Sequence, residues 1–293
     1  MSLQRRTSLS RALMIVLLLV CAVVALTPLV WLVAATTKGP DDLFHYTFFA
    51  PRFSAQNYHD LFHYTFFAPR FSAENYHDLF TKVPFLRYLM NSLFVTGATV
   101  VVQLFFSSLA GFALAKYEFV GKKVVMVIML TTLLIPGQVV MAPLYEQLYH
   151  LGLVDTRLGL IIPGAVSVFG IFLFRQSILQ VPDELLQAAR LDGCTEFRIY
   201  WDIVMPVTRP MIGAFCLISF MAAWNNFLWP QILLHHDDKF TLPIALNQMI
   251  GIYGNQYGML MAGTLVSVLP VAILFLVLQR EFVAGLTAGA VKG

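Results

Sequence analysis

Six long apolar segments dominate this sequence and leave few folds open to it. A helix needs about 20 apolar residues to cross the roughly 30 Å of bilayer hydrocarbon, and each segment is long enough to do so. The only Lys, Arg, Asp or Glu inside them are Arg175 and Arg209, near segment ends where a long side chain can reach the membrane surface. The sequence therefore predicts an all-α polytopic membrane protein with six transmembrane helices. The segments cover about 12–35, 90–114, 124–145, 158–178, 209–233 and 258–279.

Composition supports the same class. The chain has 293 residues, of which 58% are hydrophobic and 12% charged, with a mean hydropathy of +0.74. A soluble domain of this length could not bury so much apolar surface. The net charge of +3 gives no indication of nucleic-acid binding. The three cysteines have no metal-ligand or redox spacing and are interpreted as apolar packing residues: Cys21, Cys194 and Cys216.

The distribution of basic residues predicts the orientation. The first apolar segment follows Arg5, Arg6 and Arg11 and is too long for a cleavable signal peptide, so we expect a retained signal anchor. If the N-terminus is inside, twelve of the 19 Lys and Arg residues lie inside and seven outside. The excess of positive charge on the inside predicts that residues 1–11 and the tail 280–293 are cytoplasmic.

The first external loop contains a tandem repeat. Residues 42–59 recur at 60–77, and Gln56 against Glu74 is the one difference. Two copies are too few for a solenoid, so a recent duplication and an assembly artefact both fit. We predict no metal site there, because duplication alone accounts for the four histidines. They are His45, His59, His63 and His77.

The apolar segments contain prolines and a cluster of polar and aromatic residues. Pro136, Pro143 and Pro163 each free a backbone carbonyl within a span, which fits either a static kink or a hinge. The fifth segment carries two adjacent amides, which should face protein or water rather than lipid. Its tryptophans fit an interfacial belt, or they could stack on a sugar. The candidate substrate path is Trp224, Asn225, Asn226 and Trp229.

The polar stretch 182–210 separates the fourth and fifth apolar segments. Its first half predicts a short helix that begins after Pro182 and stops at Gly193. Its second half predicts a helix capped by Thr195 that ends before Pro206. Two short charged helices between spans fit either an ordinary loop on the lipid headgroups or a docking surface for a partner outside the bilayer.

The amino-acid sequence of this stretch favours the docking surface. It resembles the cytoplasmic EAA loop of the permease subunits of bacterial ABC importers, which runs EAA, three residues, Gly, about nine residues, then I-x-L-P. The matching residues are Ala188, Ala189, Asp192, Gly193, Ile203 and Pro206. Gln187 replaces the usual Glu, which removes a charge, and Met205 replaces Leu.

In that family the loop is the coupling helix that fits a groove on the ATPase. The resemblance therefore implies a coupling loop at 182–208, with Asp192 and Gly193 shaping the end of its first helix. The residues implied in ATPase coupling are Asp183, Glu184, Gln187, Ala188, Ala189, Asp192, Gly193 and Pro206.

Three further runs narrow the resemblance to the carbohydrate-uptake branch, of the maltose-transporter G-subunit type. They are Trp224–Pro230, Thr241–Pro243 and the tail Gly285–Gly293. This resemblance implies a type I ABC importer permease fold over 12–293. It also implies a heterodimer with a second homologous permease, two cytoplasmic ATPase subunits and an external sugar-binding protein. The tail would reach the ATPase through Gly289, Val291 and Lys292.

The sequence lacks an energy source of its own. It has no G-x-x-x-x-G-K-[ST] phosphate loop and no Asp, Glu or Lys in the middle of a predicted span. We therefore predict that the chain is not an enzyme and binds no cofactor, with ATP and Mg²⁺ held by the partner ATPase. The predicted function is sugar import across the bacterial inner membrane by alternating access. The alternative is an ion-coupled secondary transporter. The predicted spans have no evident Arg or Lys pair for a phosphate, which favours a neutral ligand.

Overall fold

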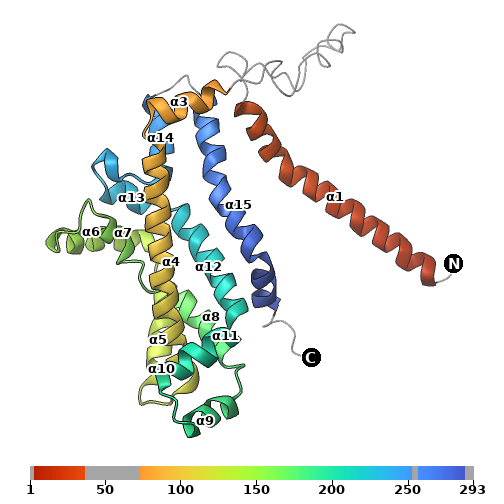
Figure 1. Ribbon diagram of the computed structural model, residues 1–293, viewed down its shortest axis with the longest axis vertical. Coiled ribbons are helices and arrows are strands. Elements are labelled where there is room, and N and C mark those ends of the chain that lie inside the picture. The colour runs from red at the N-terminus through yellow and green to blue at the C-terminus, as the bar shows by residue number, and fades with distance from the viewer. Residues whose placement is uncertain (1–2, 37–72, 253–256, 288–293) are drawn as a thin grey trace. The chain divides into compact units, whose positions relative to one another are not determined.

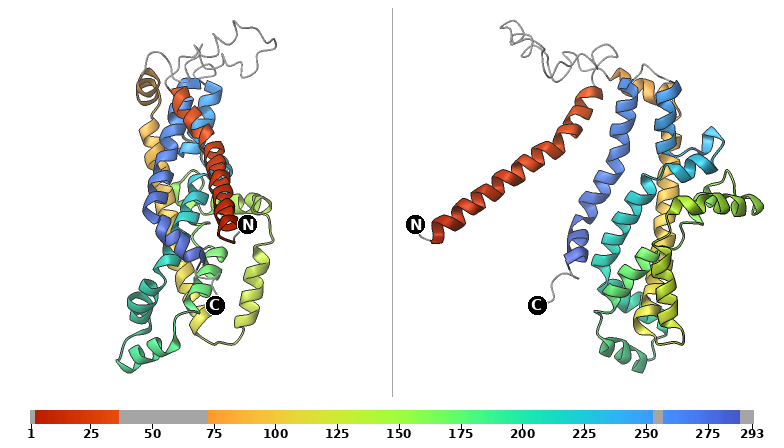
Figure 2. Two further views of the ribbon diagram at one scale, coloured as in Figure 1. Left: turned by 90° about the vertical axis from the view of Figure 1, so that its right-hand side faces the viewer. Right: turned by 180° about the vertical axis from the view of Figure 1, so that it is seen from behind.

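A computed structural model describes residues 3–36, 73–252 and 257–287, and these ranges are helical without a strand. Their helices form two compact units, one from residues 1–85 and 246–267 and the other from 86–245 and 268–293. Figure 1 labels the helices, and Figure 2 shows them from two further sides. The predicted all-α fold is confirmed. Most of the tandem repeat, with His45, His59 and His63, lies outside the described residues, as do the tail residues Gly289, Val291 and Lys292.

The first unit contains α1 (Leu3–Thr36), α3 (Glu74–Lys82), the end of α14 (Leu242–Ile252) and the start of α15 (Tyr257–Thr287). The carbonyl of Thr36 accepts a hydrogen bond from Asn75 Nδ2 at 2.8 Å, so α3 caps the end of α1. Along α1 the apolar side chains from Leu13 to Leu26 are more than half exposed. This is the surface that a helix embedded in lipid presents.

Three helices are long and apolar enough to cross a membrane: Leu13–Thr36, Phe85–Lys116 and Tyr257–Gly285. Two pairs of helices pass the same test only as bent pairs. Lys122–Thr132 meets Gly137–His150 at 94°, and Glu196–Val207 meets Arg209–Trp224 at 81°. The described residues thus provide three to five apolar spans, and the full set of six remains a prediction.

The second unit starts with the long helix α4 (Phe85–Lys116), which is followed by α5 (Lys122–Thr132), a 3₁₀ turn at Gly137–Val140 and α6 (Met141–His150). Then come α7 (Arg157–Ile161) and α8 (Val168–Ile178). The chain continues through α12 (Arg209–Trp224), α13 (Leu228–Leu233), a 3₁₀ turn at Asp237–Lys239 and the start of α14.

Each of the middle apolar segments is broken. Pro136 sits between α5 and the 3₁₀ turn, and Pro163 lies between α7 and α8. Proline cannot donate the backbone bond that continues a helix, which accounts for both positions. The third break, at residues 225–227, separates α12 from α13 and contains no proline. Pro136 and Pro163 therefore lie at breaks, whereas Pro143 lies in the first turn of α6 and Pro28 and Pro270 lie inside unbroken helices.

The 182–208 segment forms α9 (Asp183–Leu191), α10 (Glu196–Arg198), a π-helix at Ile199–Val204 and α11 (Met205–Val207). Figure 1 shows α9 and α10 at the end of this unit where α4 ends and α5 begins. The buried core beneath them joins α4, α8, α9, the π-helix and α12. Its members are Phe112, Phe174, Ile178, Val181, Leu186, Ala189, Ile199, Tyr200, Val204 and Phe215.

Close helix contact in this core depends on Gly111. A Cβ at this position would lie 2.7 Å from Phe174 Cβ and 2.9 Å from the backbone nitrogen of Arg175. These distances are too short for a side chain, so glycine allows α4 and α8 to approach each other. This contact fixes the position of α8 beneath the 182–208 segment.

Candidate functional site

The 182–208 segment has the helix ends that its sequence predicts. After α9, Gly193 adopts φ +81°, its N–H donates to the carbonyl of Arg190, and the N–H of Cys194 donates to that of Ala189. This is the Schellman arrangement, which favours glycine because its left-handed residue would crowd a side chain. Thr195 caps the next helix, since its hydroxyl accepts from the N–H of Arg198 at 3.4 Å.

The prediction that the second helix ends before Pro206 was wrong. The chain stays helical through α11 as far as Val207. Residues 199–204 form a π-helix, whose wider turn shifts the carbonyls that an α-helix would place against the proline ring. The turn also brings Tyr200 into the core, where its hydroxyl lies 2.7 Å from that of Ser108.

Ion pairs fix this segment to the end of α4. The Lys116 side chain is only 5% exposed, and its ammonium donates to Asp183 at 2.6 Å and to the carbonyl of Val181 at 2.5 Å. Lys116 holds the pKa of Asp183 below its ordinary value of 3.8. Asp183 is therefore ionised at neutral pH, and α9 begins at a charged contact with α4.

A second ion pair joins the two short helices. Arg190 donates to Glu196 through Nε at 2.7 Å and through Nη2 at 3.2 Å, and the Tyr117 hydroxyl donates to the same carboxylate. Arg190 first, and then Tyr117, hold the pKa of Glu196 below its ordinary value. Burial, reinforced by the nearby carboxylate, raises the pKa of Tyr117. The segment is thus a braced unit rather than a loose loop.

Three large apolar side chains of this braced unit are exposed. Leu191 is 90% exposed, Phe197 58% and Trp201 55%, and the last two rings stack with centroids 6.4 Å apart. Charged residues flank them in the sequence: Arg190, Asp192, Glu196, Arg198 and Asp202. An exposed apolar patch with a polar rim is typical of a protein-protein contact.

A second feature of the same unit is a cavity of about 400 Å³, which we call the polar cavity. Its volume is in the range of roughly 300–1,000 Å³ found for small-molecule sites. One wall is a stripe on α4, and α7, α12 and α13 supply others. None of the described residues that line it is Asp, Glu, Lys, Arg or His. The polar and indole groups are Ser92, Thr96, Thr99, Gln103, Ser167, Ser219, Trp224, Asn226, Trp229 and Thr241.

Thr241 stands out in this cavity. Its side chain is buried, and its hydroxyl makes no hydrogen bond within the part of the chain that the structure describes. A buried hydroxyl without a partner is costly, by about 1–3 kcal/mol. The oxygen itself has almost no exposed surface, so a polar ligand in the cavity would bond to it only after the surrounding wall moves.

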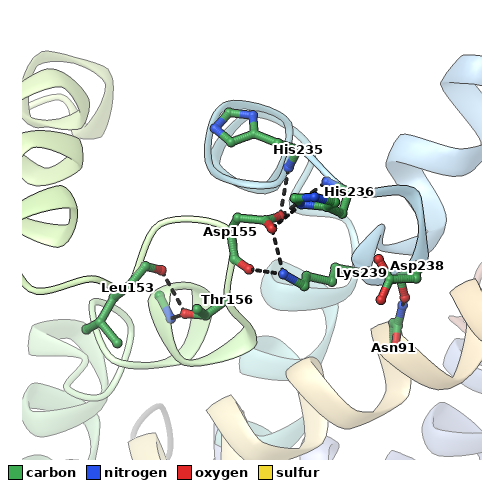
Figure 3. A network of polar contacts seen from close by, with 9 residues as sticks. Asn91, Leu153, Asp155, Thr156, His235, His236, Asp238 and Lys239 are labelled. Atoms are coloured by element: carbon green, nitrogen blue, oxygen red, sulfur yellow. Dashed lines mark hydrogen bonds and ion pairs between the residues drawn. The ribbon is translucent and has the colours of Figure 1, made fainter.

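Asp155 holds one wall of the cavity together (Figure 3). Its carboxylate accepts from the backbone N–H groups of His235 at 2.9 Å and His236 at 3.2 Å, and from Lys239 at 2.6 Å. Its own N–H donates to the carbonyl of Leu233 at 3.0 Å. These bonds join the turn before α7 to the end of α13, and both helices line the cavity.

We expect Asp155→Asn to lower the free energy of unfolding by about 2 kcal/mol at neutral pH, because Lys239 loses its charged acceptor. Asparagine tolerates the φ of +58° found here, so backbone strain adds little. Burial alone would raise the pKa of Asp155, but the bonds from His235, Lys239 and His236 outweigh it and hold that pKa well below 3.8.

A carboxyl group whose pKa is lower in the folded protein stabilises the fold at pH values above its unfolded-state pKa. This stabilisation is lost as the pH falls through the folded-state pKa. The difference in free energy of unfolding between wild type and Asp155→Asn should therefore be largest at neutral pH and shrink in strong acid. Thermal unfolding in detergent at several pH values measures it, with the exposed neighbour Asp237→Asn as the control. Equal stability of the two variants at neutral pH would contradict the role of Asp155.

Comparison with known proteins identifies the family. Residues 103–286 match the family described as binding-protein-dependent transport system inner membrane component. The chain belongs to this family. The predicted family and the inner-membrane location are therefore confirmed.

Relatives and a solved structure agree with this assignment. The permease is 43% identical over 209 residues to the arabinooligosaccharides transport system permease protein AraQ of Bacillus subtilis, covering 71% of this chain and 74% of AraQ. It is 35% identical to the lactose transport system permease protein LacG of Rhizobium radiobacter, over 69% and 74% of the two chains. None of these matches supports the alternative of an ion-coupled carrier.

The fold also matches a crystal structure of a bacterial ABC transporter involved in the import of the acidic polysaccharide alginate. The TM-score is 0.79, with 23% identity over 96% of this chain and 99% of that one. At this identity the likeness supports the fold. The family is one of transport proteins, which agrees with the prediction that this permease is not an enzyme.

The structure divides the predicted coupling residues between two faces of the 182–208 segment. Asp183, Glu184, Gln187, Ala188, Asp192, Gly193 and Pro206 are exposed. Ala189 is only 7% exposed and packs inward on the core, so it supports the segment rather than its outer surface. Leu191, Phe197 and Trp201 belong to the predicted helices but were not among the predicted coupling residues, although apolar residues in a polar stretch were a visible signal.

Three of the four predicted path residues line the polar cavity: Trp224, Asn226 and Trp229. Asn225 does not, because it ends α12 and donates to the carbonyl of Met221 at 2.9 Å. The stripe on α4 was missed. Its residues, Ser92, Thr96, Thr99 and Gln103, are spaced by four, three and four, which places them on one helix face and could have revealed the wall.

Proposed function

We propose that this permease is a membrane subunit of an ATP-driven importer that takes up a neutral sugar or sugar derivative. The observation that carries the substrate class is the polar cavity, whose hydroxyls, amides and indoles suit a neutral, hydroxyl-rich ligand. A phosphate or carboxylate would need a cation, and the described lining residues supply none. The relatives named for arabinooligosaccharides and lactose agree with this class.

The 182–208 segment would transmit energy from a separate ATPase. Its exposed residues Leu191, Phe197 and Trp201 would enter a groove on that subunit, and the Lys116–Asp183 ion pair to α4 would pass the movement on. ATP and Mg²⁺ would be held by the ATPase, with no cofactor on this chain. Alternating access then follows if closure of two ATPase subunits moves α9 and with it the cavity walls.

The other partners follow from the family name and the resemblance. They are a second homologous permease that completes a heterodimer and an external binding protein that delivers the sugar. In this arrangement residues 1–11, the 182–208 segment and the tail 280–293 are cytoplasmic. The loop 42–77 is external. The tail residues Gly289, Val291 and Lys292 would contact the ATPase.

Thr241→Val tests the cavity. Valine has the same shape, and the lost hydroxyl has no partner among the described residues, so the fold should be equally stable or slightly more so. If the hydroxyl binds sugar, the KM for uptake should rise about fivefold to tenfold, the effect of one hydrogen bond of about 1–1.5 kcal/mol. Uptake of labelled lactose and arabinooligosaccharides by cells carrying the complete transporter measures this change.

The matched control is Thr264→Val, because Thr264 donates to the carbonyl of Leu260 and does not line the cavity. Unchanged uptake by Thr241→Val would show that the Thr241 hydroxyl does not bind the sugar. Equal or faster uptake of an acidic oligosaccharide would contradict a neutral substrate.

A further inference from the structure

A second cavity, of about 490 Å³, lies at the turn between α4 and α5, and we call it the basic pocket. Three cations and one carboxylate line it, so it carries a net positive charge. Because it shares no lining residue with the polar cavity, sugar transport does not explain it. Its lining residues are Glu118, Phe119, Gly121, Lys122, Lys123, Val124, Met126 and Arg175.

Two of the three cationic side chains have nitrogen atoms that remain able to bind an anion. Lys122 is engaged, since its ammonium donates to Glu118 at 2.8 Å and to the carbonyl of Tyr117 at 2.9 Å. Toward the described residues, Arg175 donates through Nε alone, to the carbonyl of Leu114 at 3.3 Å. Lys123 is exposed, and within the described ranges no hydrogen bond or ion pair to it is found. Lys123 and the outer nitrogens of Arg175 can therefore meet an anion.

The backbone adds to the positive charge. The first turn of α5 lines the pocket, and its N-cap, Gly121, has φ +88° and no side chain to cap the helix. The exposed N–H groups at a helix start attract anions. This contribution supplements the two cations.

An apolar cleft of about 30 Å³ continues from the basic pocket along α5. Met126 and Arg175 line both spaces, so the two are adjacent. The cleft has room for about one water-sized group, so an acyl chain would lie mostly along the exposed face of α5 beside it. Among its described lining residues, all but Arg175 are apolar. They are Leu114, Met126, Met129, Leu130, Val168, Ile171 and Phe172.

The site thus has a cationic end and an apolar end on one helix. No residue of α5 is buried, and Val127 and Ile128 remain 63% and 59% exposed beside the cleft. A soluble anion would use only the cationic end. A molecule with a charged head and a hydrocarbon tail matches both ends.

We propose that the basic pocket and the apolar cleft bind an anionic phospholipid. The phosphate pairs with Lys123 and Arg175, and one acyl chain follows α5 past Met126 and Met129. The orientation predicted from basic residues puts this end of α5 at the cytoplasmic surface, where anionic lipids attract Lys and Arg. The bound lipid would hold α5 against α8, close to the Tyr117–Glu196 contact that braces the 182–208 segment.

The test compares two double variants of the complete purified transporter in detergent. Lys123→Gln with Arg175→Gln removes both proposed phosphate partners. Lys82→Gln at the end of α3 with Arg87→Gln at the start of α4 is the control, which removes the same charges from exposed positions away from the pocket. Native mass spectrometry counts the bound molecules during titration with short-chain phosphatidylglycerol, with phosphatidylcholine and with inorganic phosphate.

We expect wild type and control to retain phosphatidylglycerol in preference to phosphatidylcholine. The first double variant should bind phosphatidylglycerol about 30-fold more weakly, since each cation near a membrane surface contributes about 1 kcal/mol. Equal retention by both double variants would overturn the proposal. So would equal binding of the two lipids, which would indicate unspecific lipid around α5.

Two further outcomes identify a different occupant. Inorganic phosphate that displaces phosphatidylglycerol at equal concentration would show a phosphate site without a role for the cleft. Efficient disulfide crosslinking between Leu130→Cys, which lines the cleft, and a cysteine series on the second permease would show that protein covers the cleft. Either result would overturn the lipid assignment. Neither depends on which sugar the permease carries.

Discussion

Replacing Leu191 with aspartate is expected to abolish transport while the permease still folds and reaches the membrane. The side chain is 90% exposed at the end of α9 and lies outside the buried core, so the substitution costs the isolated chain little. In the proposed complex the same position enters an apolar groove on the ATPase. An unpaired carboxylate buried there would cost about 3 kcal/mol or more, which weakens association by about 100-fold or more.

Copurification of the ATPase with the tagged permease measures this loss, and uptake in cells measures its consequence. Leu151→Asp is the control, because Leu151 is also a well exposed leucine, 69% exposed, but lies between α6 and α7 and outside the 182–208 segment. A Leu191→Asp permease that retains its ATPase and transports normally would show that α9 docks by another face, or does not dock.

Leu186→Asp is expected to have the largest effect on the fold. Leu186 is 1% exposed on the inner face of α9 and belongs to the core beneath the 182–208 segment. Aspartate there would lose the apolar contacts and bury a carboxylate among Ile178, Val181 and Tyr200. The combined cost is on the order of 4 kcal/mol or more, enough to detach α9 from the core.

Leu185 provides an adjacent control. It lies one residue earlier on the same helix but is 48% exposed, so Leu185→Asp should change thermal stability by much less. Unfolding in detergent compares the two, and Leu186→Ala gives an intermediate loss of about 2–3 kcal/mol. Similar stability of Leu185→Asp and Leu186→Asp would mean that α9 does not pack as the structure has it.

Together these variants separate two properties of one short helix. Leu186 tests whether α9 is attached to the core, and Leu191 tests whether α9 engages a partner. Two ion pairs connect these properties, because Lys116 fixes the start of α9 to α4 and Arg190 fixes α9 to α10. A movement of α9 would therefore reach α4, which also carries the stripe of polar residues in the cavity wall.

The sequence by itself determined the class of protein and the local ends of its helices. Long apolar segments without charge can bury their backbone polar groups only as helices in a membrane, which is why α1, α4 and α15 were predictable. Gly193 and Thr195 set helix ends through their own backbone and hydroxyl, so neighbours in sequence were sufficient. The π-helix before Pro206 was not predictable, because core packing of Tyr200 and Val204 accompanies it.

Only the tertiary structure decided which polar groups meet. The cavity draws Ser92, Ser167, Asn226 and Thr241 from four parts of the chain, and no spacing in sequence reports that they converge. The same holds for Asp155, whose carboxylate binds residues 80 or more positions away, and for Arg175, which reaches the basic pocket from α8. Local rules act over a few residues, whereas a site depends on how separate helices pack, and that packing is a property of the whole fold.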